Sequence, residues 1–188
     1  MNSSDAIIRQ ILSDIRVELA SEFDRNFERQ SFFSRAWQRH KSPHKGNAHI
    51  LVQTGTLRRS IKSRSDATSV TFHSDLPYSS IHNEGGKIKV TARMKRYFWA
   101  RYYETAGRFT RRKDGSLSRS KSQTTLSSMA EFYKHMALMK VGSYVTIPKR
   151  QFIGRSPELE KEVTAIIEKN LQEYFEENAE KIIKKYDK

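Results

Sequence analysis

The sequence predicts an α+β fold: a small, mainly antiparallel sheet flanked by N- and C-terminal helices, with a helical basic insertion at residues 90–145. Three observations predict it. Apolar residues recur with helical spacing near both ends of the 188-residue chain, short middle stretches alternate between apolar and polar residues, and glycines or prolines separate these stretches. Because this length is typical of one domain, we expect a single domain over residues 1–188.

The first expected helix lies at the N-terminus. Asp5 suits the positive end of its dipole, and its apolar residues follow the spacing of a helix with one buried face: Ile7, Ile8, Ile11, Leu12, Ile15 and Leu19. Large apolar side chains continue from Phe23 to Trp37, which predicts a second helical stretch. Residues 38–49 are expected to form a loop.

Two short strands are expected next. Thr54-Gly55 is expected to turn the chain into the first strand, which contains Ile61. Val70 and Phe72 alternate with polar residues in the second strand, after a turn. This pattern predicts a hairpin.

A short helix and two more strands follow in the prediction. Residues 78–84 favour one or two helical turns, which Gly85 and Gly86 interrupt. Residues 87–91 and 144–147 then alternate between apolar and polar side chains, as strands do.

An aromatic helix is expected at residues 92–106, with Gly107 as its stop. At about 100° per residue, its aromatic side chains spread over roughly 240° of the helix: Tyr97, Phe98, Trp99, Tyr102 and Tyr103. A surface helix usually buries a stripe not much wider than about 100°. We therefore expect two covered faces, and another subunit is the candidate cover for one of them.

A basic loop is expected at residues 108–123, where Ser, Thr and Gly separate the side chains of Arg108, Arg111, Arg112, Lys113, Arg119 and Lys121. Helical spacing returns between Leu126 and Ala137 and ends before Gly142. The helix, the loop and the second helix together form the expected insertion.

The last expected helix has a clear start, because Ser156 can cap it and Pro157 suits its first position. An unbroken helix reaching Tyr186 would be about 45 Å long, whereas a domain of this size is roughly 30–35 Å across. We therefore expect the helix to break, to bend or to pack on a neighbouring molecule.

Charge is unevenly distributed along the chain, whose net charge is +14. Residues 1–32 carry −2 and residues 157–188 carry −3, whereas residues 33–156 hold 25 basic and 6 acidic side chains, or +19. Such asymmetry is informative about partners. The middle region is either a solvated basic surface or a surface that meets nucleic acid or acidic neighbouring subunits.

Several classes of chemistry lack their residues. The chain has no cysteine, which excludes disulfides, thiolate zinc sites and cysteine nucleophiles. No phosphate-binding, dinucleotide-binding or hydrolase motif occurs, and no apolar run approaches the roughly 20 residues of a membrane helix. His40, His44 and His49 have metal-like spacing but no nearby acidic ligand. We expect no enzymatic activity, no cofactor, no metal and no membrane partner.

His82 and Glu84 raise the question of acid–base catalysis. No candidate nucleophile or oxyanion loop accompanies the pair, so we expect His82 to pack beside the glycine turn. The stronger alternative is nucleic-acid binding, because residues 86–122 contain 12 Lys or Arg and 2 acidic residues, interleaved with aromatics. Such a stretch predicts salt-sensitive phosphate binding and base stacking.

Three segments together resemble the phage virion morphogenesis family, the Mu-like tail-completion proteins. They are ILVQTGTLRRSI at residues 50–61, YSSIHNEGG at residues 78–86 and IPKRQFIG at residues 147–154, in the order of that family. Two features depart from it. Gln151 stands where the family usually has proline, and about 55 residues separate the second and third segments.

The resemblance implies a structural protein that completes the tail or joins head to tail as one subunit of a ring. Its implied partners are copies of itself and neighbouring connector or tail subunits, with passing genomic DNA as a further candidate. It implies assembly in the host cytoplasm and a place in the virion. The positions that match the family motifs are expected to act as scaffold or interface: Thr54, Gly55, Leu57, Arg58, Ser60, Tyr78, His82, Gly85, Gly86, Pro148, Arg150 and Phe152.

Overall fold

The structure is a computed structural model that describes residues 3–39 and 49–186. It consists of helices and antiparallel strand pairs, so the predicted α+β class is confirmed. The strands described form three separate two-stranded pairs, where the sequence suggested one small sheet. Two-stranded pairs are only marginally stable in water by themselves, so each pair depends on the helices that pack against it.

The chain folds into two compact units. The first unit contains residues 1–36, 54–79 and 151–188, and the second unit contains residues 37–53 and 80–150. Both units are therefore assembled from segments that are far apart in the sequence. The expected single domain with an insertion at 90–145 stays a prediction.

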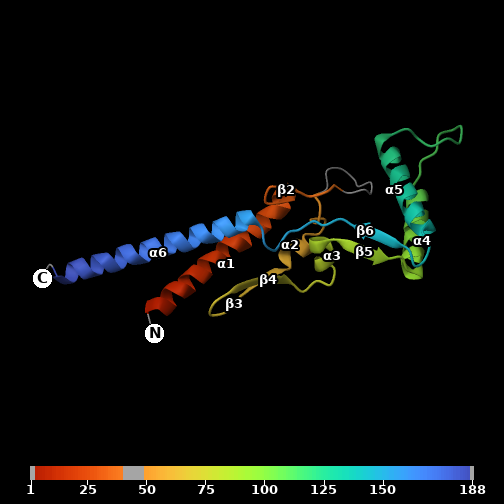
Figure 1. The fold of residues 1–188 in the computed structure, drawn as a ribbon. Helices are drawn as coiled ribbons and strands as arrows, with labels where there is room; N and C mark the ends of the chain where they lie inside the picture. The colour runs from red at the N-terminus through yellow and green to blue at the C-terminus, as the bar shows by residue number, and fades with distance from the viewer. Residues whose placement is uncertain (1–2, 40–48, 187–188) are drawn as a thin grey trace. The chain divides into compact units, whose positions relative to one another are not determined.

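Helices α1 (Ser3–Arg29) and α6 (Pro157–Tyr186) dominate the first unit. Figure 1 shows the end of α1 beside the beginning of α6, with the two helices diverging toward the chain termini. The Ser156 hydroxyl accepts a hydrogen bond from the Leu159 amide at 3.1 Å, which confirms the predicted cap. Helix α6 runs over 30 residues without a break, so the first of the three expected outcomes for this long helix, a break, does not occur.

The predicted second helical stretch up to Trp37 is wrong. Helix α1 ends at Arg29, and a small hairpin of β1 (Ser31–Phe32) and β2 (Arg35–Ala36) follows. Gln30 and Phe33 have φ angles of 57° and 51°, in the left-handed region that ends helices and forms tight turns. Because neither residue is glycine, the local sequence carries no obvious stop signal.

The hairpin of β3 (Ile61–Ser65) and β4 (Val70–Ser74) is confirmed, with Ile61 opposite Ser74. The expected direct turn into β3 is wrong, because one helical turn, α2 (Thr56–Arg59), intervenes. Gly55 precedes α2 with φ 68°, a conformation that glycine adopts without strain. The motif therefore forms a turn, a short helix and a strand.

The core of the first unit lies between α1, α6 and the hairpins. Phe23 packs edge-on against Phe72 of β4, with ring centroids 4.9 Å apart. Four buried residues form the centre: Ile15, Leu19, Phe23 and Phe32. Partly buried side chains of α6, such as Val163 and Ile167, cover this centre.

The second unit begins with α3 (Ser79–Glu84), followed by the antiparallel pair β5 (Gly86–Lys89) and β6 (Tyr144–Ile147). Gly86 lies opposite Ile147, and Lys89 lies opposite Tyr144. The short helix and both strands were predicted from alternation and from the glycine pair. These elements bring residues 78–86 and 147–150 together.

Helices α4 (Ala92–Ala106) and α5 (Lys121–Leu138) pack antiparallel beside each other at the end of the β5–β6 pair (Figure 1). We call residues 92–138 the arm. Phe98 contacts the rings of Phe132 and Tyr133, at 6.4 and 6.3 Å between centroids. The predicted loop at 108–123 is three residues too long, because α5 already begins at Lys121.

Candidate functional site

Arg58, in the first family-like segment, is held by two carboxylates of α1. It forms an ion pair with Asp24 through two nitrogens and donates a hydrogen bond to Glu28 at 2.7 Å. The hydrogen bonds that Arg58 donates, first to Asp24 and then to Glu28, raise the pKa of Arg58, and accepting from Arg58 lowers the pKa of Asp24. This clamp attaches α2 to α1.

The other residues of this segment support the same turn. Gly55 and Leu57 are buried, whereas Thr54 is exposed and lies 2.9 Å from Thr56 between their hydroxyl oxygens. The Ser60 hydroxyl donates to the Leu57 carbonyl at 2.7 Å and lies 2.7 Å from the Ser74 hydroxyl. These contacts suit scaffold positions, and the interface role stays a prediction.

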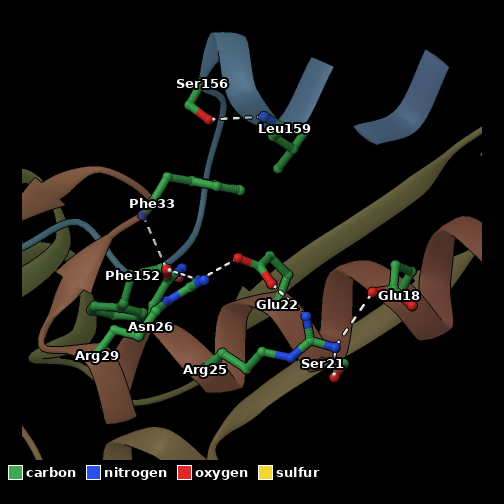
Figure 2. Close-up of polar contacts among 10 residues, drawn as sticks. All are labelled: Glu18, Ser21, Glu22, Arg25, Asn26, Arg29, Phe33, Phe152, Ser156 and Leu159. Carbon is green, nitrogen blue, oxygen red and sulfur yellow. Dashed lines mark hydrogen bonds and ion pairs between the residues drawn. The ribbon is translucent and has the colours of Figure 1, made fainter. Parts of the chain in front are cut away.

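A buried polar network on α1 was missed by the sequence reasoning (Figure 2). Glu22 and Asn26 are 3% and 0% exposed. Glu22 forms ion pairs with Arg25 and Arg29, and Asn26 accepts a hydrogen bond from the Phe33 amide at 3.1 Å. The only signal in the sequence was that two polar residues lie on the apolar face of a predicted helix. Buried polar groups need hydrogen-bond partners, so such residues indicate a polar network.

Phe152 anchors the third family-like segment in the first unit. Its side chain is fully buried, and its ring centroid lies 5.3 Å from that of Phe27. Its carbonyl oxygen accepts a hydrogen bond from the Asn26 side chain at 3.3 Å (Figure 2). Asn26 therefore connects the chain after α1 with the chain before α6, which is the predicted anchoring role of Phe152.

Gly85 and Gly86 meet the third segment in the second unit. Gly85 has φ 74°, and a Cβ atom there would lie 2.7 Å from the Lys149 amide nitrogen. A Cβ atom at Gly86 would lie 2.6 Å from the end of Ile81. Pro148 is partly buried after β6, and Tyr78 is 41% exposed before α3. Close backbone approach therefore explains Gly85, whereas Gly86 leaves room for the end of the Ile81 side chain.

His82 and Arg150 form the polar centre of this region. The His82 carbonyl accepts a hydrogen bond from the Arg150 amide at 2.8 Å, and the buried Arg150 side chain donates to the Gln38 carbonyl at 2.9 Å. Burial, and then the charge of Arg150, lowers the pKa of His82. A half-buried, preferentially neutral histidine beside a tight turn suits the predicted packing role.

Clusters of metal-binding side chains and membrane-spanning helices are both absent from the described part of the chain. Residues 3–39 and 49–186 contain no group of three His, Cys, Asp or Glu side chains that could hold a metal ion. Of the three loop histidines, His40 and His44 lie outside the described residues. None of the described helices has the length and apolar character needed to cross a bilayer.

The five aromatic residues of α4 have different environments. Phe98 faces α5, while Trp99 and Tyr102 are partly buried against each other, with centroids 5.7 Å apart. Tyr97 and Tyr103 are 57% and 65% exposed. Part of the expected second face is therefore open to solvent in the single chain, and its cover by another subunit stays a prediction.

The six basic side chains of the predicted loop are all exposed, from Arg108 to Lys121. The loop has internal bonds: the Arg111 side chain donates to the Gly115 carbonyl at 2.8 Å. Buried Gln123 of α5 accepts a hydrogen bond from the Thr110 amide at 2.8 Å, which fastens the loop to the arm. The loop therefore offers a dense, outward-facing set of positive charges.

An apolar groove of about 630 Å³ runs along the first unit between α1, β4 and α6. Its lining includes Ile11, Ile15, Val70, Val163 and Ile167. Apolar grooves and exposed aromatic side chains are common where proteins bind other molecules. The polar clusters of the described residues, in contrast, hold backbone segments together.

Comparison with known proteins adds the family. The chain matches none of the curated proteins and none of the solved structures with which it was compared. A family model does match, and it covers residues 2–172, which include all three family-like segments and the arm. The chain therefore belongs to the phage virion morphogenesis family.

Proposed function

We propose that this protein completes the phage tail or joins head to tail, acting as one subunit of a ring in the virion connector or tail. Membership of the family supports a structural role in phage morphogenesis, as a component of the virion. The observation that supports the finer role is the exposure of aromatic side chains in both units. Tyr97, Tyr103 and Phe175 are 57%, 65% and 64% exposed.

Exposed aromatic side chains favour a binding function, because aromatic residues are enriched in the buried centres of protein interfaces. In the proposed assembly, neighbouring copies cover these side chains. Closed symmetry limits the ring to a fixed number of subunits and leaves a central path for DNA. The mechanism is then binding without catalysis, and assembly takes place in the host cytoplasm before head and tail join.

The basic loop of the arm is the proposed contact for an adjoining partner. Its positive side chains suit an acidic surface, which either another copy of this chain or a neighbouring connector or tail subunit can supply. Replacing the six with Ser is expected to abolish head–tail joining and to leave the fold intact, because all six are exposed: Arg108, Arg111, Arg112, Lys113, Arg119 and Lys121.

The test is complementation of a phage that lacks this gene. Electron microscopy of the deletion lysate is expected to show separate heads and tails, and the native gene should restore complete particles. The six-fold Ser variant should fail, with circular dichroism and thermal unfolding like those of the native protein. Normal particles from that variant would refute the role of the loop, and complete particles without the gene would refute the proposed function.

Nucleic-acid binding is the second candidate, and the charge of the arm favours it. Residues 92–138 contain 11 basic and 3 acidic side chains, a net charge of +8. A dedicated nucleic-acid binder should bind random DNA below about 1 μM at low salt, with a log–log salt slope near −0.9 for each phosphate contacted. A fluorescence anisotropy titration measures this slope, and weak binding would leave only the structural role.

A further inference from the structure

Charge is divided between two surfaces of the same chain. The helix pair, defined as residues 3–29 of α1 and 157–186 of α6, contains 14 acidic and 9 basic side chains, a net charge of −5. The arm carries +8. The positive arm of one copy can therefore face the negative helix pair of a second copy. Complementary electrostatic potentials promote such association.

The second half of α6 has an apolar centre with an acidic border. Leu171 and Phe175 are 36% and 64% exposed, and their spacing of four residues places them on the same helix face. Glu168 is exposed on the same face of the helix, and Glu176 is exposed next to Phe175. A desolvated apolar centre with a polar rim is the usual anatomy of a protein interface.

The distal part of the arm has an aromatic centre with a basic border. Tyr103, near the end of α4, is 65% exposed and its ring stacks with that of Trp99 at 5.8 Å between centroids. The basic loop follows directly, with Arg112, Lys113 and Arg119 exposed. This surface has the same anatomy as that of α6 and the opposite charge.

We propose that the arm of one copy binds the helix pair of the next copy. In this contact Tyr103 lies against Leu171 and Phe175, and the loop bases face the acidic side chains of α6. Because two different surfaces meet, the contact is heterologous. Two joined copies still have one free arm and one free helix pair, so further copies can add. The repeated contact closes a ring when the rotation between neighbouring copies returns to its starting point. The inference rests on the proposed function, because it assigns the surfaces of that ring.

Charge exchange between two variants tests the contact. The arm-reversed variant carries Arg112→Glu, Lys113→Glu and Arg119→Glu, and the helix-reversed variant carries Glu168→Lys and Glu176→Lys. All five positions are exposed, so both variants are expected to fold. Sedimentation velocity at low and high salt measures the self-association of each purified full-length chain, of their mixture and of the variant that combines all five substitutions.

Each variant alone is expected to associate about 10- to 100-fold more weakly than the native chain, because like charges then face each other. The mixture should recover association, since the acidic arm of one variant meets the basic helix pair of the other. The combined variant should associate with itself, and high salt should weaken every complex. A matched control is Lys87→Glu, Lys89→Glu and Lys140→Glu, which changes exposed charges of the second unit outside the arm and should associate normally.

Phage assembly separates this inference from the proposed function. Co-expression of the two reversed variants should restore complete particles in the deletion phage, although neither variant does so alone. If neither their mixture nor their co-expression restores association or particles, the contact is not between these surfaces, and the proposed function stands as long as the native gene is required. If the deletion phage assembles normally, the proposed function itself fails. If the native chain stays monomeric while its arm binds DNA, the arm contacts nucleic acid instead.

Discussion

At the scale of single residues, the family-like positions hold segments that are distant in the sequence. Arg58 bridges from α2 to Asp24 and Glu28 of α1. The buried Arg150 side chain reaches the carbonyl of Gln38. Guanidinium groups suit this use, because their donors match carboxylates and carbonyls in fixed directions. The arginines of the first and third family-like segments are thus explained by the contacts with which they stabilise the scaffold.

Gly85→Ala is expected to lower the free energy of unfolding by about 1–3 kcal/mol, because alanine is strained at this positive φ angle. The contact of the added Cβ atom with the Lys149 backbone should lower it further. Gly115→Ala is the matched control, because Gly115 has φ 81° and nothing within 4 Å of the added Cβ atom. Urea unfolding measures both changes. Equal losses at the two positions would contradict the close approach of Gly85 to the third family-like segment.

Glu162→Gln tests the acidic contact between α6 and α1. Burial, and then the charges of Glu22 and Glu18, raises the pKa of Glu162. A carboxyl group whose pKa is raised by folding contributes stability when the pH is below its unfolded pKa of about 4.5. This contribution is lost as the pH rises through the pKa of the folded state. The substitution is therefore expected to stabilise the protein at pH 7, by about 0.5 kcal/mol, and to have little effect at pH 4.

Urea unfolding at the two pH values measures this difference. Glu168→Gln is the control, because it removes an exposed carboxylate from the same helix. A stabilisation by Glu162→Gln that is the same at both pH values would contradict the pKa argument, since the carboxyl should already be largely protonated at pH 4.

At the scale of elements, the sequence predicted those helices and strands whose ends have local signals. Ser156-Pro157 begins α6, and Gly85-Gly86 separates α3 from β5. The end of α1 has no such signal. Gln30 adopts a left-handed conformation there, and the following Phe33 amide is bound by Asn26. Asn26 in turn donates a hydrogen bond to the carbonyl of Phe152, which is distant in the sequence. Periodicity carries no information on this contact and therefore extended the helix too far.

The candidate site could be predicted only in part for the same reason. The aromatic and basic residues of the arm stand out in the sequence because their number and spacing exceed what one buried helix face uses. Glu22 and Asn26 do not stand out, since their burial depends on the packing of α1 with chain segments around Phe33 and Phe152. The two-unit division also depends on such long-range contacts.

Phe152→Ala tests the connection between α1 and the start of α6. The ring is fully buried against Phe27, and its removal is expected to cost about 3–5 kcal/mol. Phe175→Ala, at a 64% exposed position of α6, should change the free energy of unfolding by less than about 0.5 kcal/mol. Thermal and urea unfolding measure both, and a small effect at Phe152 would contradict its anchoring role.

At the scale of the whole molecule, the charge is carried by one unit. The second unit has 19 basic and 4 acidic side chains, or +15, whereas the first unit has 16 basic and 17 acidic side chains, or −1. Exposed aromatic side chains occur in both units. These surfaces and the membership of a virion morphogenesis family are the grounds for the proposal that the protein binds its own copies.

The most direct measurement is an electron cryomicroscopy reconstruction of the head–tail junction in purified particles. The account predicts a ring of this chain in which Tyr97 and Tyr103 of each copy are covered by another molecule. A reconstruction in which residues 94–103 contact only their own chain, or particles that lack the protein, would contradict it.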